Sequence, residues 1–266
     1  MKLKLSAPSK TLLKSNIQIT GSKSETNRSL LLQALFPSIG IENLSNSDDA
    51  QVMQNGLRID NGVVDIHHAG TAMRFLTSFF ACQEGKDVTL TGSQRMTERP
   101  VKVLVEALSS LGADIEYGQN EGYPPLHIKG KKITKNKVSL PANISSQYIS
   151  SLLLTAPSLE NGLELDLVGK ITSVPYIKMT LALLSQIGVQ NEFEDNTIKV
   201  WPKTDVANIS LVVESDWSSA SYFYSIVALS DVGSSITLSA YKEDSLQGDS
   251  VLATIYRQLG VETTFS

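Results

Sequence analysis

The sequence has little cysteine, few aromatic residues and no long apolar run. Cys82 is the only cysteine in 266 residues, which excludes a disulfide within the chain and is typical of a reducing compartment. Aromatic residues make up 6% of the chain, and no basic stripe interleaved with them appears, which argues against nucleic acid as a partner. The apolar run from Ala72 to Cys82 is interrupted by polar side chains and is too short to span a bilayer. We therefore expect a cytoplasmic protein with neither a nucleic-acid nor a membrane partner.

The N-terminal segment also lacks the apolar stretch of a signal peptide. Hydrophobic residues make up 41% of the chain and charged residues 19%, as in a globular protein. Its length fits two domains, or one and a part. The formal net charge of −4 does not exclude an anionic substrate, because local fields decide binding.

A unit of helix, strand, helix and strand recurs along the chain. Segments from Thr97, Thr172 and Leu246 each carry apolar residues at helical spacing, stop at a glycine, and continue as a short alternating strand. Glycine is expected just past a helix end, because it enters the left-handed conformation without steric cost. The stop glycines are Gly112, Gly188 and Gly260. Upstream of each segment, a second apolar helix leads into a predicted strand, at Asp87–Thr91, Leu163–Val168 and Ser235–Ser239.

Three copies of the unit extend from about Gly21 to about Val213, and a fourth begins near Glu214. Three such units can bury their apolar helix faces around a common centre, but a lone fourth unit has no partner of its own. We expect a mixed α/β protein whose second domain is incomplete in this sequence. The alternative is that the fourth unit packs onto the first domain.

The predicted helix openings carry most of the hydroxyl and basic side chains. A helix N-terminus attracts anions through its free N–H groups and its dipole, and a lysine or hydroxyl there adds charge-assisted hydrogen bonds. Repeated units would bring several openings to one face, which favours a substrate with phosphate and carboxylate groups. The alternative is that each serine only caps its helix. The residues are Lys23, Ser24, Arg28, Gly70, Thr71, Arg74, Ser145, Ser146, Gln147, Ser218 and Ser219.

Eight short motifs, in order and at compatible spacing, resemble those of the 5-enolpyruvylshikimate-3-phosphate synthases. They are Gly21-Ser-Lys-Ser with Asn27-Arg-Ser, Ala69-Gly-Thr-Ala-Met-Arg74, Arg95-Met-Thr-Glu-Arg-Pro100, Tyr123-Pro-Pro-Leu126, Ser145-Ser-Gln147, Ser173-Val-Pro-Tyr176, Glu214-Ser-Asp-Trp-Ser-Ser-Ala-Ser-Tyr222 and Gln247-Gly-Asp249. The resemblance implies two lobes, each an inverted α/β barrel of three β-α-β-α-β-β units. Residues 21–213 would form the complete lobe, which binds shikimate 3-phosphate. Residues 1–20 and 214–266 would form part of the other.

The resemblance also implies roles for individual residues. Shikimate 3-phosphate would contact Lys23, Ser24, Arg28, Ser145, Ser146, Gln147, Ser173 and Tyr176. Phosphoenolpyruvate would contact Lys23, Gly70, Arg99 and Gln147, and Lys23 would be catalytic. Arginine suits such a site because its planar fork meets carboxylate or phosphate bidentately.

The implied reaction transfers the enolpyruvyl group of phosphoenolpyruvate to the 5-hydroxyl of shikimate 3-phosphate and releases phosphate. It needs no cofactor and no metal, and the full-length enzyme would be a monomer. In the family, the acid and base residues lie beyond position 266. We therefore expect the chain to be truncated and inactive alone.

Three alternatives remain open. The chain could bind shikimate 3-phosphate without turnover. It could belong to the UDP-N-acetylglucosamine enolpyruvyl transferases, although Cys82 is predicted to be a core residue and not a cysteine on a mobile loop. RNA 3′-phosphate cyclases have similar repeats, but no nucleotide-binding motif is present. His68 stands where relatives often carry asparagine; a packed or hydrogen-bonded histidine is expected there, and not a metal ligand.

Overall fold

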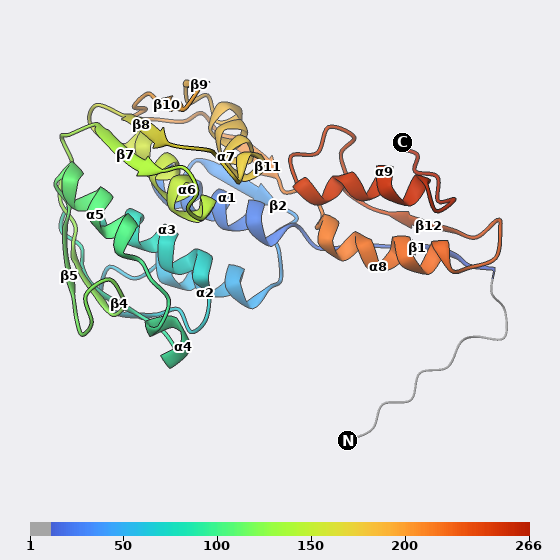
Figure 1. Ribbon diagram of the computed structural model, residues 1–266, viewed down its shortest axis with the longest axis horizontal. Helices are drawn as coiled ribbons and strands as arrows, with labels where there is room; N and C mark the ends of the chain where they lie inside the picture. The colour runs from blue at the N-terminus through green and yellow to red at the C-terminus, as the bar shows by residue number, and fades with distance from the viewer. Residues whose placement is uncertain (1–11) are drawn as a thin grey trace.

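Helices and strands alternate through residues 12–266, the part of the chain that the computed structural model describes. They form a larger part, residues 21–213, and a smaller part, residues 12–20 and 214–266, between which the chain crosses twice (Figure 1). The larger part contains α1 (Lys23–Leu35), β2 (Ile39–Glu42), α2 (Asp48–Leu57), β3 (Asn61–Asp65), α3 (Gly70–Ala81), β4 (Asp87–Thr91), α4 (Gln94–Thr97), α5 (Lys102–Leu111), β5 (Asp114–Tyr117), β6 (Leu126–Lys129), β7 (Lys137–Pro141), α6 (Ser146–Thr155), the 3-10 helix η1 (Ala156–Ser158), β8 (Leu163–Val168), α7 (Val174–Gln186), β9 (Asn191–Glu194), β10 (Thr197–Val200) and β11 (Ile209–Val212). The smaller part contains β1 (Lys14–Ile17), α8 (Trp217–Ala228), β12 (Ser235–Leu238), the 3-10 helix η2 (Gly248–Val251) and α9 (Leu252–Arg257). The protein is therefore mixed α/β, as predicted.

The two four-stranded sheets of the larger part have the same topology. Their strand orders are β3-β4-β6-β5 and β7-β8-β10-β9. In each sheet the first two strands are parallel and the remaining pairs are antiparallel. A third, two-stranded sheet pairs β2 with β11 in parallel, so Ile39 lies opposite Ile209. The first unit is thus completed by a strand from the other end of the larger part.

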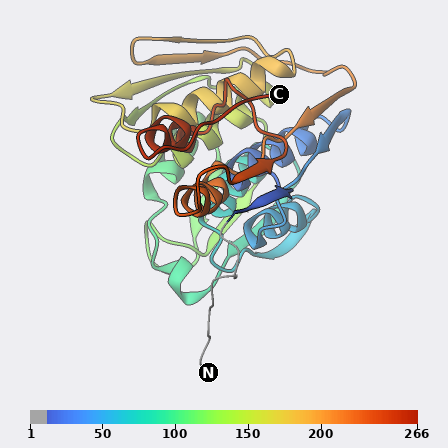
Figure 2. The ribbon, with the colours of Figure 1, turned by 90° about the vertical axis from the view of Figure 1, so that its right-hand side faces the viewer.

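Two helices, α3 and α6, lie at the centre of the larger part. Eleven of the twelve residues of α3 and nine of the ten residues of α6 are buried. Helices that are apolar on most sides belong in a core. The strands instead alternate buried and exposed side chains, as in β6 and β7, so only one face of each sheet contacts the core. Seen from the smaller part, the helices are bordered by the sheets (Figure 2).

Most of the helix ends and strands predicted from the sequence are present in the structure. The stop glycines Gly112, Gly188 and Gly260 all have positive φ, at 110°, 76° and 83°. The strands predicted at 87–91 and 163–168 have the observed bounds of β4 and β8, and β12 ends one residue before the predicted Ser239. The strand predicted after Gly260 is wrong, because residues 261–266 form no strand. Strands need a hydrogen-bonded neighbour, and β12 pairs only with β1 in the described chain.

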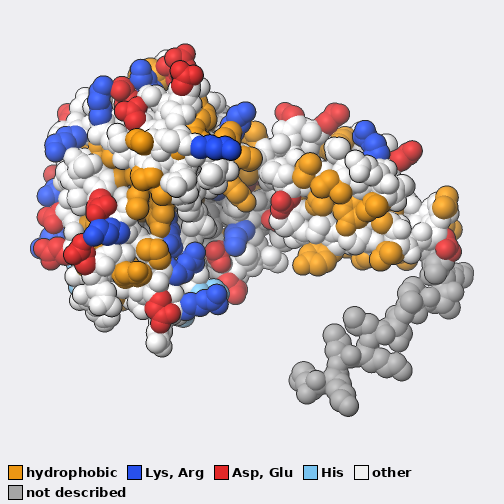
Figure 3. All heavy atoms as spheres, in the orientation of Figure 1, with side chains coloured by type: hydrophobic (Ala, Val, Ile, Leu, Met, Phe, Trp, Pro, Cys, Tyr) orange, Lys and Arg blue, Asp and Glu red, His pale blue; other side chains and the backbone are white. Residues whose placement is uncertain are grey.

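The smaller part has a hydrophobic cluster of its own. Trp217, Ala220, Tyr224 and Val261 are its buried members, and they are separate from the cluster of the larger part. On the outer side of α8, Tyr222, Ile226 and Leu229 are 73%, 42% and 89% exposed. These three follow one another at helical spacing, and apolar side chains cover much of the smaller part in Figure 3. The smaller part therefore leaves an apolar helix face uncovered in this chain.

Residues 1–11, which the domain prediction placed with the smaller part, lie outside the described residues. Among residues 12–266, every helix is too short or too polar to cross a bilayer.

Candidate functional site

Arg28, in the second turn of α1, is a buried cation that forms no ion pair within 4 Å in the described part of the chain. Its side chain is 2% exposed, and no carboxylate lies within 4 Å of it in residues 12–266. Nε donates to Thr180 Oγ1 at 2.8 Å, one Nη to Ser150 Oγ at 2.9 Å, and the other to the Ser24 carbonyl at 2.7 Å. A guanidinium has five N–H donors, so each Nη keeps one for a further acceptor. Burial lowers the pKa of Arg28 to about 10.

Tyr176, in the first turn of α7, lies next to Arg28. The Arg28 guanidinium carbon lies 5.7 Å from the centre of the Tyr176 ring, a cation–π distance. Tyr176 is 44% exposed, so part of this residue remains open to solvent. Ser173 is the N-cap residue of α7, but its hydroxyl makes no capping hydrogen bond. The Ser173 hydroxyl is therefore not used for capping.

The start of α6 carries three predicted residues. Ser145 is the N-cap of α6, and its Oγ accepts from the Gln147 N–H at 3.3 Å. Capping is thus the role of Ser145 in the described structure. Ser146 follows at the first helical position and is 8% exposed. Gln147 donates from Nε2 to Thr71 Oγ1 at 3.2 Å, which joins α6 to α3.

Gly70, the first residue of α3, lies against Arg99. A Cβ atom at Gly70 would overlap the Arg99 Nη1, so only glycine allows this approach. Arg74, one turn further along α3, is 4% exposed and donates to the Gly70 carbonyl at 3.1 Å and the Pro100 carbonyl at 2.9 Å. Burial, followed by the charge of Arg74, lowers the pKa of Arg99. The start of α3 is therefore electropositive.

Lys23 opens α1 and forms an ion pair with α2. Its Nζ lies 3.7 Å from Asp49 Oδ1, and its side chain is 47% exposed. An exposed pair at this distance is weak, so Lys23 can turn toward a bound anion at little cost. Lys and Arg side chains are spread over the visible face of the larger part, and some of them lie near the smaller part (Figure 3).

A sequence model described as EPSP synthase (3-phosphoshikimate 1-carboxyvinyltransferase) matches residues 58–265. This match covers most of the chain. The chain belongs to the EPSP synthase family. The resemblance drawn from the eight motifs is thereby confirmed.

Named relatives of the family are similar over nearly the whole chain. A 3-phosphoshikimate 1-carboxyvinyltransferase of Bacteroides fragilis is 46% identical over 268 residues, which cover 100% of this chain. The protein of the same name from Haemophilus influenzae is 38% identical and is matched by 94% of this chain. In both cases the chain spans only 64% of the relative's length.

The fold is also that of a solved EPSP synthase. The structure of the enzyme from Acinetobacter baumannii superposes with a TM-score of 0.80, at 21% identity. The superposition covers 95% of this chain and 61% of the other.

Within this EPSP synthase family chain, the predicted residues form two contacting groups. Ser24, Arg28 and Tyr176 are in one, and Gly70 and Arg99 are in the other. Gln147 reaches the second group through Thr71, next to Gly70. Lys23, Ser145, Ser146 and Ser173 lie at the openings of the same helices, and α1, α3, α6 and α7 pack against one another.

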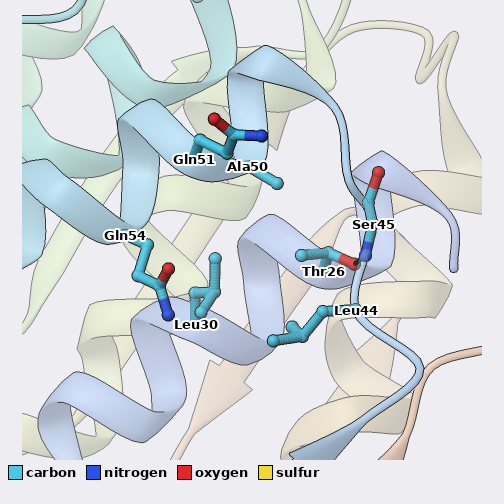
Figure 4. Close-up of a pocket in the computed structure, with 7 residues that line it drawn as sticks. All are labelled: Thr26, Leu30, Leu44, Ser45, Ala50, Gln51 and Gln54. Atoms are coloured by element: carbon cyan, nitrogen blue, oxygen red, sulfur yellow. Dashed lines mark hydrogen bonds between the residues drawn. The ribbon is translucent and has the colours of Figure 1, made fainter. Parts of the chain in front are cut away.

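Two pockets lie close to these residues without including them. One of about 220 Å³ is lined by Asp49, the partner of Lys23, and by Ala69, which precedes Gly70. His67 and His68 also line it. The other holds only about 30 Å³ between α1 and α2, room for about one water molecule (Figure 4). Neither pocket is lined by a residue predicted to bind shikimate 3-phosphate.

Sequence reasoning missed the polar residues that hold Arg28. Ser150 and Thr180 lie within apolar helices and are fully buried, and Thr180 Oγ1 also bonds Ser150 Oγ at 3.0 Å. Ser150 follows Ser146 by four positions in α6, and Thr180 follows Tyr176 by four positions in α7, so each lies on the same helix face as a predicted residue. That spacing is the signal that could have found them.

Cys82 and the histidines show no sign of a reactive or metal-binding role. Cys82 caps the end of α3 and packs partly buried against the core, and burial raises its pKa to about 12. A thiol with this pKa stays protonated and unreactive at neutral pH. In residues 12–266, no group of three His, Cys, Asp or Glu side chains is arranged to hold a metal.

Proposed function

We propose that this chain carries the shikimate 3-phosphate-binding part of a 3-phosphoshikimate 1-carboxyvinyltransferase. The complete enzyme transfers the enolpyruvyl group of phosphoenolpyruvate to the 5-hydroxyl of shikimate 3-phosphate and releases phosphate. Membership of the family and the names of the relatives support this proposal.

The observation that carries the proposal is the buried Arg28, which has no carboxylate within 4 Å in the described chain and feels the charge of Glu25 only from a longer distance. Buried charges in proteins are normally paired, because an unpaired one costs several kcal/mol of desolvation. Here the guanidinium is held by two hydroxyls and a carbonyl, with Tyr176 beside it. An anionic ligand at the openings of α1, α6 and α7 would supply the missing negative charge.

Each predicted residue then has a physical task. Ser145, Ser146 and Ser173 would donate hydroxyl hydrogen bonds to the 3-phosphate, and Tyr176 would cover the sugar ring. Lys23 would exchange Asp49 for a substrate anion and would stabilise charge that develops in the reaction. Ser24 and Gln147 would complete the contacts to shikimate 3-phosphate.

The phosphoenolpyruvate side would lie at the start of α3. Because Gly70 has no side chain, the Arg99 guanidinium lies against the backbone there and supplies positive charge for a small dianion. Gln147, whose amide reaches Thr71, would lie between the two substrates. The protein's part in this reaction is to position two anions and to stabilise charge.

At the level of the fold, we propose that residues 21–213 are a complete inverted barrel lobe of three repeated units. The buried helices, the two identical sheet orders and the β2–β11 closure support this. Residues 1–20 and 214–266 would be an incomplete second lobe, which the uncovered face of α8 supports. At full length we expect a cytoplasmic monomer that binds no nucleic acid.

Isothermal titration calorimetry with shikimate 3-phosphate, alone and with phosphoenolpyruvate, tests the proposal. We expect binding of the first ligand, and little enolpyruvyl transfer from this chain alone. Arg58→Met, which removes a cation from the end of α2, is the matched control for Arg28→Met. The proposal fails if the chain does not bind shikimate 3-phosphate, or if the two variants weaken binding equally.

A further inference from the structure

Two sequence motifs take no part in the proposed site. They are the segment from Glu214 to Tyr222 and the segment Gln247-Gly-Asp249. The first lies where the chain passes from β11, in the larger part, to α8, in the smaller part, and the second lies at the start of η2, where Gln247 is bonded to that crossing. Glu214 is 2% exposed and Gln247 is 7% exposed. Buried polar groups require partners, so their contacts show what this region holds together.

The backbone of Glu214 is bonded to the first turn of α1. The Ser22 N–H donates to the Glu214 carbonyl at 2.8 Å. In return, the Glu214 N–H donates to Glu25 Oε2 at 3.2 Å. Gly21 and Ser215 form a β-bridge beside these bonds. The opening of α1, which carries Lys23 and Ser24, is thus attached to one residue of the crossing.

The side chain of Glu214 is bonded to the smaller part. Oε1 accepts from Trp217 Nε1 at 2.8 Å and from the Lys242 N–H at 2.9 Å. Oε2 accepts from Ser245 Oγ at 2.6 Å and from Gln247 Nε2 at 3.2 Å. Four donors occupy the lone-pair directions of one carboxylate. Glu214 therefore holds the start of α1 with its backbone and the smaller part with its side chain.

We propose that Glu214 and Glu25 form a joint that fixes the opening of α1 relative to the smaller part. Both are positioning residues, since they act on ligands only through Lys23, Ser24 and Arg28. The effect on ligand binding rests on the proposed function, whereas the joint itself does not.

Glu25 gives this joint a dependence on pH. Its side chain is 7% exposed, and burial raises its pKa to about 7. Lys242 from the smaller part and Arg28 from α1 oppose this rise, and the Glu214 carboxylate adds to it. A charge therefore appears next to Glu214 as the pH passes through neutrality.

The fluorescence of Trp217 reports on the joint directly. The chain has two tryptophans, so Trp201→Phe leaves Trp217 alone, buried and bonded to Glu214. In this background we expect an emission change with a midpoint near pH 7. Glu25→Gln, which keeps the shape and removes the charge, should abolish it. Glu243→Gln, in an exposed position of the same loop as Lys242, should leave it intact. An unchanged midpoint and amplitude in Glu25→Gln would overturn the proposed joint.

A second measurement tests the positioning role. The affinity for shikimate 3-phosphate is measured at pH 6 and pH 8 in the chain with and without Glu25→Gln. At each pH, the affinity of the Glu25→Gln variant is divided by that of the parent chain. This ratio cancels the titration of the ligand itself. We expect the ratio to change at least about threefold between the two pH values, because binding and proton release are linked. A constant ratio would show that Glu25 does not position the site. If neither chain binds the ligand, the proposed function fails, and the Trp217 transition still decides the joint.

Discussion

At the scale of single residues, we expect Arg28 to contribute to ligand affinity but little to the free energy of unfolding. Because its charge is buried without a carboxylate, the folded protein gains little from it, and a long apolar side chain fills the same space. We expect Arg28→Met to change the free energy of unfolding by no more than about 1 kcal/mol, while it lowers the affinity for shikimate 3-phosphate at least about tenfold. Urea unfolding and calorimetry on the same samples measure both. A loss of stability of several kcal/mol with unaltered binding would show that Arg28 is structural.

Glu25 is expected to destabilise the protein above neutral pH. Its pKa rises from 4.5 to about 7 on folding, so between these values the folded chain holds a proton that the unfolded chain has lost. Stability therefore falls as the pH rises through this window, by up to about 3 kcal/mol, and the loss is complete above pH 7.

The variant Glu25→Gln tests this sign. Its oxygen can still accept from the Glu214 N–H, but it carries no charge. We expect it to be more stable than the parent at pH 8, by up to about 3 kcal/mol, and equal to it near pH 4.5. Urea unfolding at the two pH values measures the difference. An equal effect at both would rule out the titration of Glu25 as its cause.

At the scale of elements, a hydroxyl pair joins the two central helices. Ser78 of α3 donates to Ser151 Oγ of α6 at 3.0 Å, and Ser151 donates to the Tyr148 carbonyl at 2.9 Å. Both serines are fully buried.

Removing one hydroxyl is not equivalent to removing the other. Ser151→Ala leaves the Ser78 donor without its acceptor, so we expect a loss of about 1–3 kcal/mol. Ser78→Ala leaves Ser151 bonded to Tyr148 and should cost less. The double variant should be no less stable than Ser151→Ala, because no donor is then stranded. Additive losses in a double-mutant cycle by urea unfolding would contradict this account.

Local elements could be predicted from the sequence because local chemistry specifies them. Glycines at helix ends and alternating apolar residues predicted the end of α5 at Gly112 and the bounds of β4 and β8. The helix openings of the candidate site were found in the same way.

Long-range contacts could not be predicted in this way. The pairing of β2 with β11 joins residues about 170 positions apart, and the sequence of neither strand indicates which strand it pairs with. The same holds for the buried hydroxyls of Ser150 and Thr180, which lie in apolar helices and meet Arg28 only after folding. The strand predicted after Gly260 failed because its pattern was local and its pairing partner was absent from the described chain.

At the scale of the whole molecule, the two parts should differ in local stability. The larger part buries almost every residue of α3 and α6, whereas the buried cluster of the smaller part contains Trp217, Ala220, Tyr224 and Val261. We expect the amides of α8 and α9 to exchange with solvent at least about tenfold faster than those of α3 and α6, because fewer apolar contacts hold them closed. Native-state hydrogen exchange with mass spectrometry gives the rates. Equal protection in both parts would contradict the description of two separate cores.

The central claim is that the openings of α1, α6 and α7 form one site for shikimate 3-phosphate. A crystal structure of this chain with shikimate 3-phosphate tests it most directly. The account predicts the 3-phosphate beside Ser145, Ser146 and Ser173, with the sugar ring against Tyr176 above the Arg28 guanidinium. A ligand bound in the pocket of Asp49 and His68, or on the smaller part, would contradict the account.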